Sequence, residues 1–239
     1  MKRLLYLILL VSSFTILIES CYNDDGNLPT SSFTDARDGT IYQTVTIGDQ
    51  VWMAENLKYL PIVVGPDMGS LTTPYSYVND FFGSDVNNAK GTENFNIYGV
   101  LYNYPAAMNG ALSSIENPSG IQGICPDGWH LPSNAEWQEL VNFIGGEANA
   151  DLLIKTDTNK WAFPNENATN EFGFSALPGG SFSNSGNNFS SVGLEGYWWT
   201  SQEFEEENAL LFRLSDENIV VIGFSISKAS GFSVRCVKD

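Results

Sequence analysis

The residues able to carry out chemistry are few, and the single histidine, His130, is the first to consider. One histidine cannot form a metal site built from several imidazoles, and no H-E-x-x-H zinc motif is present. A Ser-His-Asp triad would need His130 as its base, but the sequence has no G-x-S-x-G turn to present a nucleophile. His130 lies between Trp129 and Leu131. We therefore predict a structural residue with a ring nitrogen bonded to the backbone.

Carboxylates are concentrated in a run of glutamates between residues 203 and 207. Glycoside hydrolysis needs two carboxyl groups about 5 to 10 Å apart across a cleft, and neighbours in one run do not predict that geometry. The simplest interpretation is a solvated loop, and we predict no metal site. The alternative is calcium, which takes roughly 6 to 8 oxygen ligands. The weak calcium candidates are Glu205, Glu207, Asn208 and Asp216.

A second set of residues combines aromatic rings with planar amides, as sugar binding without calcium requires. Trp161 and Phe163 lie in a polar stretch and are expected to be exposed. Trp199 is included as a candidate, although most tryptophans in ordered segments are expected in the core. The alternative is a polar loop with a locally packed tryptophan. The amides would come from Asn165, Asn167, Asn170, Asn184, Asn187 and Asn188.

Residues 1–20 have the character of an export signal. Lys2 and Arg3 precede a mostly apolar run over residues 4–18, which is shorter than the ~20 residues that span a bilayer. The residues up to Cys21 resemble the cleavage box of bacterial lipoproteins, although Glu19 replaces the usual small residue. We therefore predict a signal peptide over residues 1–20 and a lipid on Cys21, with ordinary secretion as the alternative.

Residues 21–34 are polar and rich in Gly, Pro and Ser, which predicts a flexible tether. The acidic pair Asp24 and Asp25 resembles a surface-export signal of Bacteroidetes-type lipoproteins. The chain has 11 basic and 28 acidic residues and a net charge of −17, so it would repel nucleic acid and anionic lipid. We expect contact with a membrane through the lipid anchor only.

Three cysteines are an odd number for an exported protein. If Cys21 carries a lipid, Cys125 and Cys236 remain, and an oxidising compartment would join them. The alternative, a reactive thiol, needs an electropositive pocket. The neighbours of Cys125 supply none, and Cys236 has only Arg235 and Lys238 beside it. We predict a structural disulfide.

The elements that would position these residues are mostly strands. Residues 44–47 and 50–53 flank Gly48-Asp49, which predicts a hairpin with a type II′ turn. Ser133 and Glu136 form a capping box for a helix that Gly145 ends. A second helix is expected after Pro105.

Long stretches lack a clear period. Residues 60–96 are expected to be irregular, and residues 155–193 to form surface loops. Strands are expected at residues 197–201, 209–214 and 219–225. In the last strand, Phe232, Val234 and Cys236 alternate with more polar residues, which predicts one buried face.

Three segments, residues 35–59, 123–146 and 231–239, together resemble the Fibrobacter succinogenes major paralogous domain. The resemblance implies a single α+β domain over residues 35–239 with a C-type-lectin-like fold. That fold is a mainly antiparallel sheet with about two helices and long irregular loops, and its ends meet in one sheet. Residues 129–137 are also similar to a segment of formylglycine-generating enzymes, which share the fold. No spare cysteine pair is present to hold copper, so fold alone is implied.

The family has no established activity, so function is predicted from the combined features. We expect an outer-membrane lipoprotein exposed at the cell surface that acts as a binding or adhesion module without a cofactor. Its partner would be a glycan or a cell-surface protein. The alternatives are a carbohydrate-active enzyme and a structural subunit of a surface appendage.

Overall fold

The computed structural model describes residues 31–156, 160–162, 165, 168–215 and 220–239. The predicted signal peptide, Cys21 and most of the predicted tether lie outside these residues. Five short helices and three antiparallel sheets make up the described part, which is therefore an α+β structure as expected. Within it, no helix has the length and apolar character that crossing a membrane requires.

The first sheet joins the two ends of the described chain. All its strand pairs are antiparallel, and Ile47 pairs with Gln50 across the predicted two-residue turn, where Gly48 has a φ of +62°. Residues 31–34, expected at the end of the tether, instead form an edge strand of this sheet. In spatial order the strands are β1 (Ser31–Thr34), β2 (Ile41–Ile47), β3 (Gln50–Met53), β13 (Val237–Lys238) and β6 (Trp129–His130).

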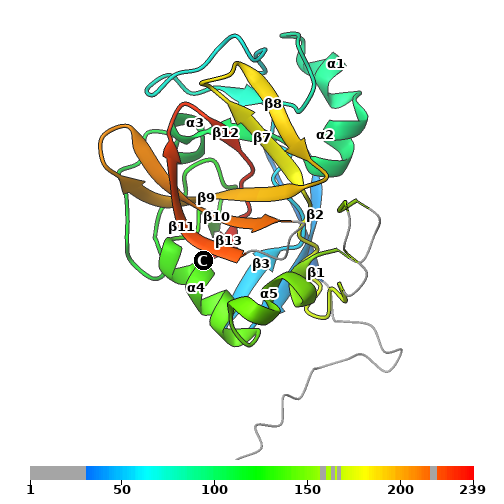
Figure 1. Ribbon diagram of the computed structural model, residues 1–239, viewed down its shortest axis with the longest axis vertical. Coiled ribbons are helices and arrows are strands. Elements are labelled where there is room, and N and C mark those ends of the chain that lie inside the picture. Colours follow the sequence, from blue (N-terminus) through cyan, green and yellow to red (C-terminus); the bar gives the residue numbers. More distant parts are fainter. Residues whose placement is uncertain (1–30, 157–159, 163–164, 166–167, 216–219) are drawn as a thin grey trace, which may run out of the picture.

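The two other sheets lie beside each other in Figure 1. The second is ordered β4 (Ser76–Tyr77), β5 (Leu101–Asn103), β12 (Gly231–Phe232), β7 (Gly179–Ser183) and β8 (Asn188–Val192). The third is ordered β11 (Val220–Ser227), β10 (Asn208–Ser215) and β9 (Glu195–Phe204).

The predicted helices are both present. Ser133 caps α4 (Asn134–Phe143) through the expected capping box with Glu136. Helix α3 (Tyr104–Met108) carries Pro105 in its first turn. Three further helices were not expected, because each is short and lacks a long apolar period. They are α1 (Val86–Lys90), α2 (Glu93–Tyr98) and α5 (Glu147–Ile154).

Two other expectations were wrong. Part of the stretch predicted as loop, residues 179–192, is the β7–β8 hairpin, whose many serines hide a strand pattern. The C-terminal segment is not one half-buried strand. Ser233, Arg235 and Val237 are as buried as the residues with which they alternate. The segment has no solvent face because it passes from the second sheet to the first through the interior.

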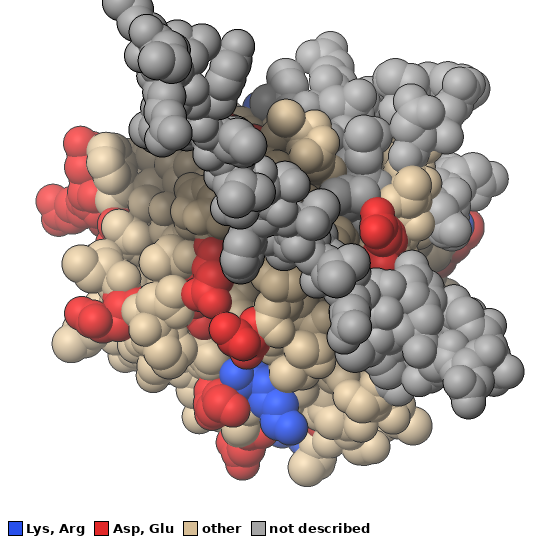
Figure 2. All heavy atoms as spheres, turned by 90° about the horizontal axis from the view of Figure 1, so that it is seen from below, with Lys and Arg blue, Asp and Glu red and all other residues tan. Residues whose placement is uncertain are grey.

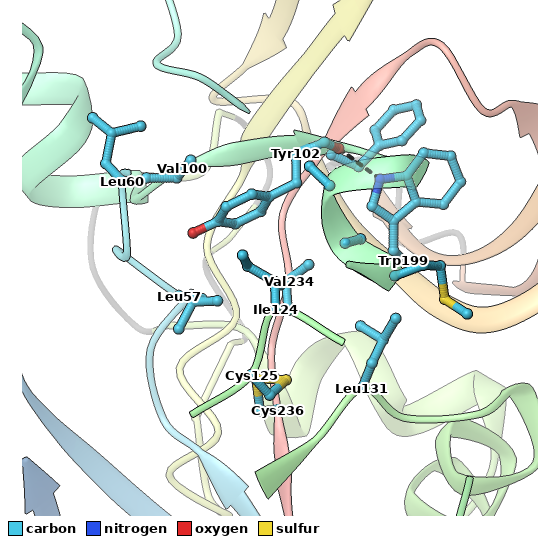
Figure 3. Packing of buried hydrophobic residues seen from close by; sticks show 14 of the residues in the cluster. Leu57, Leu60, Val100, Tyr102, Ile124, Cys125, Leu131, Trp199, Val234 and Cys236 are labelled. Carbon is cyan, nitrogen blue, oxygen red and sulfur yellow. Dashed lines mark hydrogen bonds between the residues drawn. A yellow bond between two sulfur atoms is a disulfide. The ribbon is translucent and has the colours of Figure 1, made fainter. Parts of the chain in front are cut away.

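The core contains the predicted disulfide. Cys125 and Cys236 are both fully buried, their sulfurs are 2.01 Å apart, and the bridge joins positions 111 residues apart. Figure 3 shows the bridge below Val234 and Ile124 within the largest apolar cluster. It therefore ties β13 to the segment before α4.

Arg235 is the largest charged side chain inside the fold, with no exposed surface. Its guanidinium donates to the backbone oxygens of Phe174 and Ser175 and to Asn56 Oδ1. Burial lowers the pKa of Arg235, and the charge of Glu55 offsets only part of this effect, so the pKa is about 9. Arg235 therefore fixes the loop around Phe174, which leads into β7.

Candidate functional site

A groove of about 200 Å³ opens where hairpin β7–β8 meets β11. Its polar lining consists of hydroxyl groups from both strands of the hairpin and from the residue before β12. The serines are Ser181, Ser183, Ser190, Ser191 and Ser230. Hydroxyls both donate and accept hydrogen bonds, so this wall can match either polarity of a ligand.

The hairpin holds the hydroxyls in register. Ser181 pairs with Ser190 across the strands, and their Oγ atoms are 3.2 Å apart. Gly180 has a φ of +65°, and a Cβ atom there would lie 2.4 Å from the backbone oxygen of Ser190. Only glycine fits such close backbone approach. The strand geometry thus determines where the serines face.

Aromatic rings form the apolar side of the groove. Tyr197 lies 5.1 Å from Phe232 between ring centroids, with the rings tilted by 51°. Phe232 is 4% exposed and belongs to the core, whereas Phe224 is 39% exposed. Tyr197 is also half-buried. The groove therefore offers ring surface next to hydroxyl groups.

No described residue that lines the groove carries a charge. The face shown in Figure 2 differs, because acidic side chains appear on it at several places and basic ones at few. A charged group entering the groove would lose water without gaining an ionic partner. The groove also lacks the paired carboxylates of a glycosidase. Its chemistry suits a neutral ligand that carries both hydroxyl groups and an apolar face.

The whole groove lies within a recognised sequence family. A sequence profile of the Fibrobacter succinogenes major domain matches residues 45–238, which is most of the chain. The chain belongs to this family. No curated protein and no solved structure matches this chain. The matched range also includes the disulfide and α4 of this Fibrobacter succinogenes major domain.

Both candidate tryptophans of the domain are buried. Trp161, expected to be exposed, is 4% exposed, and its Nε1 donates to the backbone oxygen of Ala176. The ring also packs under Lys155, whose Nζ is 4.6 Å from the ring centroid. Trp199 has no exposed surface and donates to the backbone oxygen of Tyr102 (Figure 3). Neither indole offers a face to a ligand, so this expectation was wrong.

The candidate asparagines do not form one site. Asn184, Asn187 and Asn188 gather at the turn of the β7–β8 hairpin, beside the groove, and the last two are exposed. Asn165 lies elsewhere, and its Nδ2 donates to the backbone oxygen of Thr156. Asn170 also turns inward, because its side chain bonds to Ser175. Asn167 and Phe163 lie outside the described residues.

The acidic run forms the end of β9 and the turn to β10. The positive charge that it contacts is the side chain of Lys228. Lys228 Nζ lies 3.0 Å from Glu203 Oε1 and donates to the backbone oxygen of Glu206 at 2.7 Å. Glu205 and Glu207 are exposed, and Asn208 pairs with the end of β11. Among the described side chains, no group of three or more His, Cys, Asp or Glu is arranged to hold a metal ion. Asp216, the remaining calcium candidate, lies outside them.

His130 is buried as expected, but its ring bonds to carboxylates and not to the backbone. Nε2 lies 2.6 Å from Glu136 Oε1, and Nδ1 lies 2.8 Å from Asp239 Oδ1. Burial lowers the pKa of His130, but the hydrogen bonds and charges of Glu136 and Asp239 outweigh it and raise the pKa above its ordinary value. The other oxygen of Glu136 accepts from the backbone of Ser133 and Ser119. This network locks the start of α4 onto the first sheet.

The groove serines were missed in the sequence. Serine is common in loops and at surfaces, so five serines spread over residues 181–230 carry no distinctive spacing. The alternation of Ser181, Phe182 and Ser183 was a usable signal, because it has the period of a strand. Pairing of that strand with a second serine-rich one depends on the fold.

Proposed function

We propose that this chain is a cell-surface binding module that holds neutral carbohydrate in the serine-lined groove and does no catalysis. The carrying observation is the composition of the groove, which is lined by five serines and by aromatic rings and by no charged residue. Sugars present the same combination, hydroxyl groups around an apolar ring face. At about 200 Å³ the groove is smaller than the ~300–1,000 Å³ typical of drug-sized ligands, which favours one sugar ring of a longer chain.

We further propose a C-type-lectin-like fold and a lipid on Cys21 that holds the module to the outer membrane, exposed outside the cell. The fold proposal is supported by the first sheet, in which β3 pairs with β13, so that the two ends of the domain meet in one sheet. The anchor proposal rests on the sequence of residues 1–25. Labelling with a palmitate analogue should mark the wild-type chain and fail with Cys21→Ser. Protease added to whole cells should remove the domain, and resistance to it would place the domain on the inner face.

The ligand is tested with a glycan array, using the chain from residue 22 onward, once in calcium and once in chelator. Selective binding to neutral glycans in both buffers is expected. Ser190→Phe should remove binding at the groove, because a ring at this position fills it. Ser185→Phe is the matched control, since Ser185 is exposed at the hairpin turn and does not line the groove.

Other results of these experiments would favour a different function. Loss of binding in chelator would favour calcium-mediated recognition at the acidic turn. Breakdown of a bound glycan over time would favour the carbohydrate-active enzyme. Absence of binding by a folded protein that copurifies in a stable assembly would favour the structural subunit and refute the groove as a sugar site.

A further inference from the structure

A second pocket, of about 470 Å³, lies beside helix α3 and shares no lining residue with the groove. One wall comes from the loop of residues 71–74 and another from α3 and the residues after it. Glu203 and Lys228 close the third side. Leu71, Pro74 and Met108 give the pocket apolar surface next to these charged groups.

Tyr104 lines this pocket and carries a polar atom that the fold does not use. Its side chain is almost fully buried, and its hydroxyl has no hydrogen-bond partner among the described residues. Burial raises the pKa of Tyr104 most, the charge of Glu203 raises it further, and a hydrogen-bonding contribution from the Ser113 side chain lowers it, although the Ser113–Tyr104 geometry is not that of a formed hydrogen bond. The Ser113 hydroxyl itself accepts from the backbone of Glu203. A buried hydroxyl without a partner destabilises a fold relative to phenylalanine, so this oxygen needs another explanation.

Lys228 and Glu203 present a donor and an acceptor side by side. An ammonium has three N–H donors, and Lys228 uses two of them, on Glu203 Oε1 and on the backbone oxygen of Glu206. The Glu203 side chain is 46% exposed, so its second oxygen is reachable from solvent. The Lys228 Nζ is 5.7 Å from the centroid of the Tyr104 ring, which places all three groups around one space.

This arrangement matches two neighbouring hydroxyl groups on one ring. One hydroxyl accepts from the free N–H of Lys228 and the other donates to the carboxylate of Glu203, while the Tyr104 hydroxyl bonds to a third oxygen. The ion pair of Lys228 and Glu203 has no net charge. A charged ligand would therefore find an ionic partner only by separating the two side chains. The apolar wall would cover the C–H face of the ring.

We propose that the Tyr104 pocket is a second carbohydrate site, which takes an uncharged sugar ring through a pair of adjacent hydroxyl groups. The choice of carbohydrate over other neutral diols rests on the proposed function, whereas the residues of the site do not. Two sites on one small domain would let a glycan chain, or two chains, bind more tightly than a single ring.

The test measures binding of six monosaccharides to the chain from residue 22 onward by saturation-transfer NMR and titration. Glucose, galactose, mannose and N-acetylglucosamine are the neutral probes, and glucuronic acid and glucosamine carry opposite charges. Tyr104→Phe should weaken binding of the preferred neutral sugar roughly fivefold, the effect of one lost hydrogen bond, while the unfolding midpoint stays equal or rises. Glu203→Gln should also weaken binding. Tyr98→Phe is the control, because Tyr98 is a buried tyrosine that lines neither site.

The outcomes separate this inference from the proposed function. Binding that survives Ser190→Phe but weakens in Tyr104→Phe supports the second site, whatever happens at the groove. Binding that is lost in Ser190→Phe and unchanged in Tyr104→Phe overturns the second site and leaves the groove proposal intact. Equal affinity for charged and neutral sugars, or no sugar binding by folded protein, also overturns it. A fall in stability in Tyr104→Phe would show that the hydroxyl serves the fold.

Discussion

Removal of the disulfide should lower the stability of this domain by a large part of its total. Cys125 and Cys236 are 111 residues apart, and the chain-entropy relation gives about 5 kcal/mol for a loop of that length. Native domains are stable by only ~5–15 kcal/mol, so the loss would leave a marginal fold. Since both side chains are fully buried, Cys125→Ala/Cys236→Ala avoids adding unpaired polar groups to the core.

The assay is urea unfolding of wild type and double variant, followed by tryptophan fluorescence at one pH. With a typical slope of ~1–3 kcal/mol per molar urea, the midpoint should fall by roughly 2 M. Wild type unfolded and refolded in reductant should match the variant, because the buried bridge becomes accessible to reductant only after unfolding. Cys21→Ser is the control and should unfold as wild type. A midpoint shift below about 0.5 M with an unchanged slope would refute the entropy argument, and a smaller slope would point to residual structure in the unfolded chain.

Four further changes follow from contacts within the described part. The raised pKa of His130 stabilises the fold below its ordinary value of 6.5, so the melting temperature should fall as pH rises through the folded pKa, and His130→Gln should remove this slope. The lowered pKa of Glu136 acts in the opposite sense, so stability should fall again as the medium is acidified below 4.5, a fall that Glu136→Gln should reduce. Ser133→Ala removes the α4 cap and should cost about 1 kcal/mol in urea unfolding, and no loss would contradict the cap. Gly180→Ala should destabilise the β7–β8 hairpin and also weaken any groove binding, because its Cβ would meet the Ser190 backbone, and wild-type binding would contradict this.

Local rules predicted the parts of the fold that depend on neighbours in sequence. The capping box at Ser133 is such a case, because a hydroxyl and a carboxylate three residues apart satisfy backbone donors without help from elsewhere. The turn at Gly48 is another. The disulfide followed from counting, since one cysteine was assigned to the lipid and only one pair remained.

The remainder depended on partners far along the chain. Trp161 lies in a polar stretch, and only the meeting of that stretch with Ala176 buries it. Arg235 reads as a surface residue of a strand, yet it finds its acceptors about 60 residues earlier, at Phe174 and Ser175. The groove is harder still to predict, because its polar residues are ordinary serines, and the pairing of β7 with β8 and β12 in the second sheet brings them together.

Residues 231–238 contribute one strand to the second sheet and one to the first, which has a consequence for the timing of folding. β12 lies between β5 and β7, and β13 lies between β3 and β6, so this late segment occupies an interior place in each sheet. A chain that is synthesised from its N-terminal end cannot complete either of these two sheets until residues 231–238 have been made. The domain would therefore stay open through synthesis and through any passage across a membrane, and would close in one late step. A chain truncated before residue 231 should then remain unfolded, not form a smaller domain.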